Sequence, residues 1–366
     1  MSKIISIGTA VPAHRHEQDD ILRFMQMVYA TNETDKRKMK FIYHQSGIDT
    51  RYSVIPDYSR DIYDWKFYPQ SENLEPFPSL EQRMMYYNKF APALSVDAIR
   101  NCLDAGHSHE ITHLITVSCT GMSAPGLDLQ IMELLDLPKT IYRTSINFMG
   151  CYAAIHALKM ADSICKTTPG AQVMIVCTEL CTLHFQHEGT TDNITSSLLF
   201  ADGAGAALVC HDDHARTGLH LKHFYSEVIT RGKRDMAWEL SSSGFVMTLS
   251  GYVPELIEED FAPLVKNAFQ NSGCSQEDTT HWCIHPGGKR ILDAVCKTLK
   301  FTNGELQACY DILREYGNMS SATIFFVLNR ILQELKSGNS EKDNVVFGAA
   351  FGPGLTMETF VASTAN

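Results

Sequence analysis

One cysteine of this chain stands where a cysteine can become a nucleophile. Cys151 follows Gly150, which can form a tight turn, and it opens the run CYAAIHALKMADSI, whose apolar residues recur at helical spacing. At the start of a helix, unpaired backbone amides and the helix dipole favour a thiolate over a thiol. Because free cysteines are commonly small core residues, this context alone leaves a structural and a catalytic role equally open.

A histidine and an asparagine in the second half of the chain are candidate partners. His285 ends the apolar run HWCIH and precedes a Pro-Gly-Gly turn, a position at which parallel sheets place ligands. Asn318 begins the run NMSSATIFFVLNRILQEL, where an asparagine can also act only as a helix cap. Together with Cys151 they predict one site, in which an imidazolium stabilises a thiolate and His285 and Asn318 donate to an acyl oxygen.

The elements that carry these residues repeat along the chain. The run THLITVS begins at Thr112 and THWCIHP begins at Thr280, and each is followed by a long helical segment, one at Cys151 and the other at Asn318. A short apolar run then follows in both halves, AQVMIVCTE in the first and NVVFGAAFGPG in the second. This shared order predicts duplication of one strand–helix unit, with the site built across a pseudo-two-fold axis.

Apolar runs alternate with helical periodicity through the middle of the chain: HLITVS, GLDLQIMELLDL, YRTSINF, the Cys151 segment and VMIVCTE. The alternation predicts an α/β fold with a mostly parallel sheet covered by helices. Residues 211–219 (HDDHARTGL) form a polar interruption, and we place the join between the halves there. The predicted division is 1–215, which carries the cysteine, and 216–366, which carries the histidine and the asparagine.

Composition excludes several classes of function. The net charge of −11 argues against a nucleic-acid or membrane-surface binder. No apolar run approaches the ~18 residues of a spanning helix, and the start MSKIISIGTAVP lacks a signal-peptide pattern. We therefore expect a cytoplasmic protein that binds neither nucleic acid nor membrane.

The remaining cysteines and histidines do not predict a metal site. The eleven cysteines include no CxxC pair, so neither a disulfide framework nor a zinc site is indicated. Cys177 and Cys181 are expected to share one face of a strand and to pack in the core. The pairs His184/His187 and His211/His214 have ligand-like spacing but no obvious third ligand, so no metal is expected.

Four segments carry a resemblance to a known family. GCYAAIHAL, IHPGGKRIL, YGNMSSATI and FGAAFGPGLTMET resemble, in order and over nearly the whole chain, the signatures of chalcone-synthase-like type III polyketide synthases, and several positions are similar to bacterial members. HPGGxxIL and FGPGLTxET are specific to that group within the thiolase superfamily. The resemblance implies a homodimer and a thiolase-like five-layer αβαβα fold made of two pseudo-symmetric halves.

The resemblance also implies an acyltransferase reaction. Cys151 takes a starter acyl group from coenzyme A or an acyl carrier protein, and His285 is its base and ion-pair partner. Malonyl-CoA loses CO2 while His285 and Asn318 bind its thioester oxygen, and the enolate attacks the bound acyl group. Cyclisation then gives a pyrone, a resorcinol or another phenolic product. No cofactor is implied beyond the coenzyme A thioesters themselves.

Other positions are expected to shape the substrate site. Phe200, in LLFADGAGA, matches the family's aromatic gatekeeper, and Met247 stands where a second aromatic gatekeeper is expected. Cys119 and Ala124 stand where plant members have Thr and Met. Three residues of the two most specific motifs are expected at the same site: Gly287, Gly352 and Pro353.

Two large side chains distinguish this chain from the plant enzymes. Trp238 and His184 stand where chalcone synthase has Gly and Thr, and they would fill part of its cavity. A small or aliphatic starter is therefore expected. Lys38 matches one residue of the basic cluster for the coenzyme A phosphates, whereas Phe41 and Gln45 replace two others.

Three alternatives remain open from the residues. Ketoacyl synthase III and hydroxymethylglutaryl-CoA synthase share the fold and the nucleophile, but the former usually has a different histidine motif and the latter uses a glutamate base. A non-catalytic thiolase-fold partner subunit would usually have lost one of the three site residues, and here all three are present. An active condensing enzyme would consume malonyl-CoA and release CO2 without any other protein, whereas a non-catalytic partner subunit would not.

Overall fold

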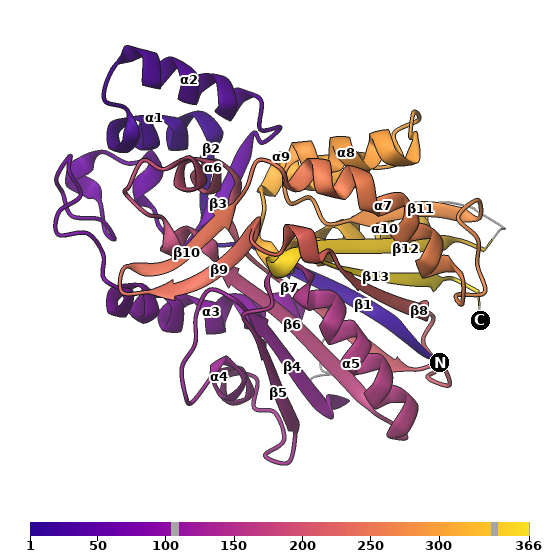
Figure 1. The fold of residues 1–366 in the computed structure, drawn as a ribbon. Helices are drawn as coiled ribbons and strands as arrows, with labels where there is room; N and C mark the ends of the chain where they lie inside the picture. Colours follow the sequence, from indigo (N-terminus) through magenta and orange to yellow (C-terminus); the bar gives the residue numbers. More distant parts are fainter. Residues whose placement is uncertain (104–109, 338–342, 366) are drawn as a thin grey trace.

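A nine-stranded sheet organises the computed structural model, which describes residues 1–103, 110–337 and 343–365 (Figure 1). The strand order is β11-β12-β13-β8-β1-β7-β6-β4-β5. In that order the strands are Thr279–Ile284, Val345–Gly352, Thr356–Ser363, Leu219–Val228, Ser2–Ala10, Asp202–His211, Gln172–Leu180, His113–Ser118 and Tyr142–Asn147.

The same pairing scheme occurs in both halves of the sheet. In the first half β4 pairs parallel with β6, β6 antiparallel with β7, and β7 antiparallel with β1. In the second half β11, β12, β13 and β8 pair in the same directions. Strands β1 and β8 join the halves, and β5 adds one further strand at the edge beside β4. The sheet therefore contains the repeat that the sequence predicts.

The expectation of a mostly parallel sheet was wrong. Three pairings are parallel and five are antiparallel. Strand β13 runs back beside β12 because only the short turn Pro353–Leu355 joins them. Apolar runs of strands buried on both faces look alike in either direction, so composition alone carries no information about strand direction.

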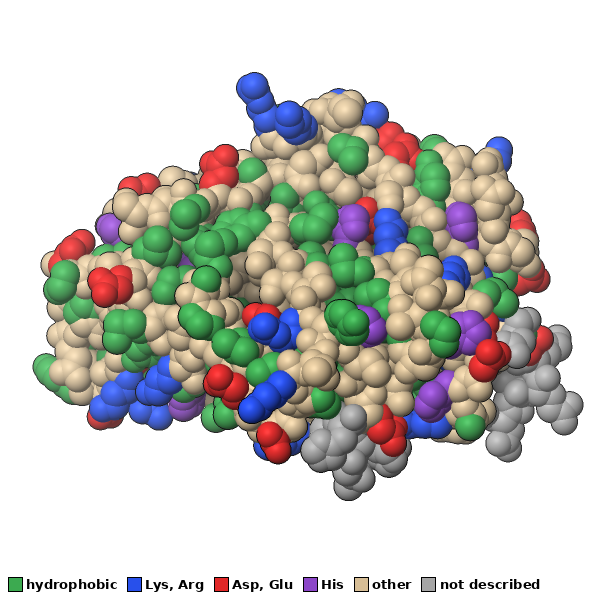
Figure 2. All heavy atoms as spheres, turned by 90° about the horizontal axis from the view of Figure 1, so that it is seen from below, with side chains coloured by type: hydrophobic (Ala, Val, Ile, Leu, Met, Phe, Trp, Pro, Cys, Tyr) green, Lys and Arg blue, Asp and Glu red, His purple; other side chains and the backbone are tan. Residues whose placement is uncertain are grey.

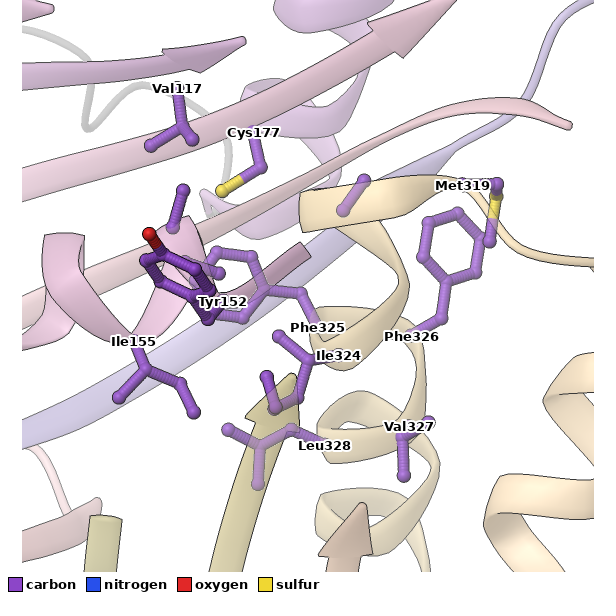
Figure 3. Packing of buried hydrophobic residues seen from close by; sticks show 14 of the residues in the cluster. Val117, Tyr152, Ile155, Cys177, Met319, Ile324, Phe325, Phe326, Val327 and Leu328 are labelled. Carbon is purple, nitrogen blue, oxygen red and sulfur yellow. The ribbon is translucent and has the colours of Figure 1, made fainter. Parts of the chain in front are cut away.

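Two central helices, α5 (Ala153–Thr167) and α10 (Thr323–Ser337), occupy matching places after β4 and after β11. Helix α5 contacts β6 and β7, and α10 contacts β1, β7 and β11. The alanine positions of α5 are fully buried, which lets the helix approach the sheet closely. Figure 3 shows Tyr152 and Ile155 beside the buried face of α10, so the two central helices share one apolar core.

The other helices cover the sheet or form a lobe at one end of it. Helix α3 lies against β1, β6 and β7, and α7 lies against β8. The lobe contains α1, α2, α6, β2, β3 and the hairpin β9–β10 (Figure 1).

The remaining elements have the following bounds: β2 His14–Glu17, α1 Gln18–Tyr29, α2 Glu33–His44, β3 Thr50–Ser53, α3 Leu80–Cys102, α4 Leu127–Leu134, α6 Thr191–Leu199, β9 Met236–Ser241, β10 Gly244–Leu249, α7 Val253–Phe269, α8 Lys289–Leu299 and α9 Gln307–Tyr316. Among the described helices, none has the length and apolar character needed to span a membrane.

Gly8 of β1 provides a test of this packing. A Cβ atom at Gly8 would overlap backbone atoms of Ala98 and Cys102 in α3, which cannot move without shifting the helix. We expect Gly8→Ala to lower the free energy of unfolding by about 1–3 kcal/mol or more. Gly251→Ala is the matched control, because a Cβ there meets no atom within 4 Å. Urea unfolding of both variants measures the difference, and equal stability would contradict the close contact of α3 with β1.

Candidate active site

Cys151 lies in a short 3-10 turn, Gly150–Tyr152, directly before α5. Gly150 has a φ of +79°, and a Cβ atom there would overlap the ring of Pro353. Glycine is therefore required both for the turn and for the approach of the Pro353 segment. The turn leaves Cys151 only 9% exposed, at the wall of a cavity.

A chain of hydrogen bonds leads from Cys151 into the second half of the molecule. Its Sγ lies 3.6 Å from the Oγ of Ser320. The Ser320 backbone N–H donates to Asn318 Oδ1 over 2.8 Å, and Asn318 Nδ2 donates to the carbonyl of Gly287 over 3.1 Å. Gly287 belongs to the turn after His285, so the three predicted site residues belong to one connected region.

His285 directly follows β11, which ends at Ile284, and it is 1% exposed. Its backbone N–H donates to the carbonyl of Ala349 over 2.8 Å, which fixes it to β12. Among the described residues, neither ring nitrogen of His285 has a hydrogen-bond partner. Leaving buried polar atoms unpaired typically costs about 1–3 kcal/mol each, so this histidine is set up for a ligand rather than for the core.

Asn318 is not the cap of a helix, because α10 begins only at Thr323. Its backbone N–H and carbonyl instead bond Leu199 and Ala201, on either side of Phe200. A short 3-10 turn precedes each central helix: Gly150–Tyr152 before α5 and Ser320–Ala322 before α10. Cys151 is the middle residue of the first turn, and Ser321, not Asn318, is the middle residue of the second. The sequence repeat therefore pairs the correct two segments of the chain. It aligns Cys151 with Asn318, whereas the structure aligns Cys151 with Ser321.

Burial shifts the pKa values of both Cys151 and His285. Burial raises the pKa of Cys151 to about 12, although the Ser320 hydroxyl and the Asn318 amide lower it in part. Burial also lowers the pKa of His285 to about 3. Desolvation thus acts against the charged form of each group. The thiolate–imidazolium pair stays a prediction.

Glu179, near the end of β6, was missed by the sequence reasoning. It is fully buried and accepts hydrogen bonds from Ser321 Oγ, from the backbone N–H of Cys119 and from Thr120 Oγ1. Burial raises its pKa to about 7, and its negative charge in turn raises the pKa of Cys151. Its one available signal was a lone acidic residue within the apolar run VMIVCTELC.

The cavity beside Cys151, called here the cysteine chamber, is lined mainly by apolar side chains and by cysteines. Its walls include five of the residues expected to shape a substrate site, together with Ser320. These five are Cys119, Phe200, Trp238, Met247 and Pro353. Cys181 also lines it, because β6 ends at Leu180 and Cys181 begins a turn. The expectation that Cys181 only packs in a strand was therefore wrong.

The side chains of His184 and Trp238 make hydrogen bonds to the backbone near the cysteine chamber. The indole Nε1 of Trp238 donates to the carbonyl of Cys119 over 2.7 Å. The ring nitrogens of His184 contact the carbonyl of Thr120 at 2.7 Å and the backbone N–H of Phe245 at 3.1 Å. The N–H of Phe245 makes Nδ1 the acceptor, so Nε2 is the protonated nitrogen. Both side chains fasten the β9–β10 hairpin to residues 119–120.

The remaining predicted residues divide into two groups. Gly352 lies against Cys151 and Tyr152, where a Cβ atom would overlap the Tyr152 ring, so it belongs to the site. Lys38 is exposed on α2, and Ala124 is exposed in the loop before α4. Neither Lys38 nor Ala124 lines the cysteine chamber. The described residues contain no cluster of ligands suited to a metal ion.

Comparison with known proteins was consistent along the whole chain. The family profile described as chalcone and stilbene synthases, N-terminal domain, matches residues 1–213, and that of the C-terminal domain matches residues 220–365. "Type III polyketide synthase C" of Arabidopsis thaliana is 28% identical over 98% of this chain and 94% of its own length. "Probable polyketide synthase 1" of Dictyostelium discoideum is 29% identical over 98% of this chain, which spans only 11% of that longer protein.

Solved structures give the same result. PKS-I of the brown alga Ectocarpus siliculosus superimposes with a TM-score of 0.90 at 25% identity, covering 99% of this chain and 97% of that one. The type III polyketide synthase domain of Steely1 from Dictyostelium gives 0.87 at 28% identity, covering 99% and 98%. 1,3,6,8-Tetrahydroxynaphthalene synthase of Streptomyces coelicolor gives 0.86 at 26%, covering 98% of both chains. The protein thus has the thiolase-like α/β fold and belongs to the chalcone and stilbene synthase family of type III polyketide synthases.

Proposed function

We propose that this protein condenses malonyl-CoA with an acyl group carried on Cys151. The observation that carries the proposal is the combination of a buried cysteine at a chamber wall with a buried histidine whose two ring nitrogens are free to bind a substrate. The reaction type is that of a decarboxylative Claisen condensation, followed by cyclisation to a pyrone, resorcinol or other phenolic product. The enzyme is an acyltransferase.

The neutral forms of Cys151 and His285 suit the loading step. The basic nitrogen of His285 takes the thiol proton as Cys151 attacks the thioester carbonyl of the starter. The C–S bond to coenzyme A then breaks, and the imidazolium returns the proton to the departing thiolate. His285 is thereby proposed as both the base and the ion-pair partner of Cys151.

Asn318 and His285 serve the extension step. The Nδ2–H of Asn318 and the ring N–H of His285 donate to the thioester oxygen of malonyl-CoA as the bond to CO2 breaks and negative charge gathers there. The enolate carbon attacks the acyl carbon on Cys151, a new C–C bond forms, and the cysteine sulfur leaves as the thiolate. Asn318 is held for this role by its bond to Gly287.

The substrates are coenzyme A thioesters, and no other cofactor is proposed. We assign Phe200 and Met247 to the entrance of the chamber and Lys38 to the coenzyme A phosphates. Gly287, Gly352 and Pro353 shape the backbone around the substrate. A small or aliphatic starter fits a chamber narrowed by Trp238, and it is delivered by coenzyme A or by an acyl carrier protein. The bacterial-type subtype and a cytoplasmic location remain predictions from the sequence.

The proposed division of the chain places residues 1–215 in one half and 216–366 in the other. The proposed assembly is a homodimer through the face of β5 and α4. Strand β5 is an edge strand in which Ile146 alone is buried, and Met122, Leu134 and Tyr142 are exposed beside it. Figure 2, which views the molecule from this side, shows hydrophobic side chains spread among the polar ones. An edge strand offers unpaired backbone groups to a partner, and exposed apolar side chains beside it favour the same contact.

Substitution of the site residues should separate two partial reactions. We expect His285→Ala or Asn318→Ala to slow malonyl-CoA decarboxylation by on the order of 10²–10³, because each removes a donor to the enolate oxygen. Cys151→Ala should abolish starter loading while retaining some decarboxylation. Release of labelled CO2 and mass spectrometry of the acylated protein measure the two steps. Equal loss of decarboxylation in Cys151→Ala and His285→Ala would refute this division.

The charge of Glu179 should set the reactivity of Cys151. Because that charge raises the pKa of the thiol, Glu179→Gln should move the pH midpoint of Cys151 alkylation by iodoacetamide to a lower pH. Asp202→Asn is the control, since this second buried carboxylate acts on Cys181 and is not among the groups that shift Cys151. An unchanged or higher midpoint in Glu179→Gln would show that Glu179 acts only through its hydrogen bonds.

The dimer face can be tested by the mass of the protein in solution. We expect light scattering to give twice the 41.0 kDa of one chain. Tyr142→Lys should shift the protein towards the monomer, because a charge would be buried at the centre of the contact. Met160→Lys, at an exposed position of α5, is the control and should leave the mass unchanged. A monomeric wild type would remove the homodimer from the proposal.

A further inference from the structure

Helix α2 presents a positively charged surface in a protein that is negatively charged as a whole. Its sequence contains four Lys or Arg and two acidic residues, whereas the net charge of the chain is −11. Both acidic residues lie in the first turn, where a negative charge is favoured by the helix dipole. The rest of the helix is therefore basic. Figure 1 shows α2 at the outer edge of the lobe, with β5 and α4 on the opposite side of the molecule.

An exposed aromatic ring lies among these basic residues. The side chain of Phe41 is 67% exposed. Arg37 and Lys38 precede Phe41 by four and three residues, so they are its neighbours on the helix surface, and Lys40 flanks it. We call Arg37, Lys40 and Phe41 the basic face. Lys38, which we assign to the coenzyme A phosphates, borders this face.

The positive charges of the basic face are not neutralised within the protein. Two acidic groups nearby are engaged elsewhere: Glu33 Oε1 lies 2.8 Å from Lys36 Nζ, and Asp19 Oδ1 lies 3.1 Å from His44 Nε2. Within the described ranges of the chain, no ion pair involves a cation of the basic face. A single exposed apolar side chain is common on protein surfaces, so the unpaired cations around the ring are what indicate a binding surface.

The shape of the basic face suits a protein partner. Small molecules usually bind in concave pockets, but the basic face is the solvent side of a helix, and none of its residues lines the cysteine chamber. Protein interfaces combine an aromatic anchor with a polar rim. The complementary surface is therefore acidic with an apolar patch. An acidic partner is repelled by the net charge of this chain as a whole, which favours its approach to α2.

Helix α2 is also joined to the segments that lead into the active site. The Oη of Tyr43 lies 2.9 Å from the Oγ of Ser197 on α6, and α6 ends directly before Phe200 of the cysteine chamber. Just after α2, Gly47 lies against the side chain of Lys289, which begins α8 after the Pro-Gly-Gly turn. A partner on α2 therefore lies beside both segments.

We propose that the basic face docks an acidic acyl carrier protein, which delivers the starter acyl group to Cys151. The proposal rests on the acyl-carrying role of Cys151 and adds the partner that loads it. In this step the C–S bond between the acyl group and the phosphopantetheine thiol of the carrier breaks, and a C–S bond to Cys151 forms. The thiol proton of Cys151 passes through His285 to the departing thiolate. Malonyl-CoA remains the extender.

The first test measures docking without an acyl group. The probe is the apo form of a bacterial fatty-acid acyl carrier protein, which lacks the phosphopantetheine arm and cannot enter the chamber. Calorimetry should show binding to the wild type, and Phe41→Ala should weaken that binding by about tenfold or more. Tyr63→Ala is the matched control, because Tyr63 is a 79% exposed ring outside α2, and it should bind as the wild type does. A wild type that does not bind, or equal binding by Phe41→Ala, overturns the proposal.

The second test reverses the charge of the face. The double variant Arg37→Glu, Lys40→Glu should weaken binding of the apo carrier protein by about tenfold or more, and added salt should weaken binding by the wild type. Lys266→Glu with Lys336→Glu, at exposed positions of α7 and α10, changes the net charge equally and is the control. If both double variants lose the same affinity, the effect comes from net charge alone and the proposal falls.

The same variants distinguish the carrier protein from two other occupants of a basic face, a nucleotide and a membrane. Binding of free coenzyme A should be unchanged in Phe41→Ala, and vesicles of phosphatidylglycerol should not retain the wild type. If Phe41→Ala weakens the binding of coenzyme A as much as that of the carrier protein, the face belongs to the nucleotide. Retention by the vesicles that Phe41→Ala abolishes assigns the face to a membrane. Either result overturns the proposal.

A loading assay separates this inference from the proposed function. Mass spectrometry of Cys151 should show that Phe41→Ala slows loading from the hexanoyl carrier protein by about tenfold or more, whereas loading from hexanoyl-CoA is unchanged. If the apo carrier protein binds through the basic face but Cys151 is loaded from neither donor, the proposed function fails and the docking surface stands. If hexanoyl-CoA loads Cys151 but the carrier protein does not bind, the docking surface fails and the function stands.

Discussion

Three hydrogen bonds to the buried carboxyl group of Glu179 hold the cysteine site in place. They reach the end of β4 through Cys119 and Thr120, and they reach the turn before α10 through Ser321. The first two contacts lie in one half of the chain and the third in the other half. An intramolecular hydrogen bond typically contributes about 0.5–1.5 kcal/mol, and more when the acceptor is charged. Glu179 therefore joins the segment that holds the hairpin to the turn that contains Ser320.

Burial is the second constraint on the site, because it shifts the pKa values of Cys151 and His285. Desolvation acts against the charged forms of both Cys151 and His285. Within the described part of the chain, the ring nitrogens of His285 are buried without hydrogen-bond partners. Such unpaired buried groups lower stability and are typical of functional sites.

The relatives share the fold at identities of only 25–29%, so the substrate must depend on side chains that differ between them. In this chain Trp238 and His184 are large and are also bonded to the backbone of residues 119–120. Trp238 lines the cysteine chamber, whereas His184 holds the same hairpin without lining that chamber. Exchange of side chains on this hairpin would therefore change the chamber without changing the fold.

The sequence by itself determined the family, the α/β class, the repeat of one strand–helix unit and the region of Cys151, His285 and Asn318, because short motifs and periodicity are local properties of the chain. Only the tertiary structure decided the direction of the strands, since apolar runs look the same both ways. It also decided the burial of Cys151 and His285 and the contacts that Ser320 and Glu179 make. These depend on burial and on contacts between residues far apart in the chain, which no single segment encodes.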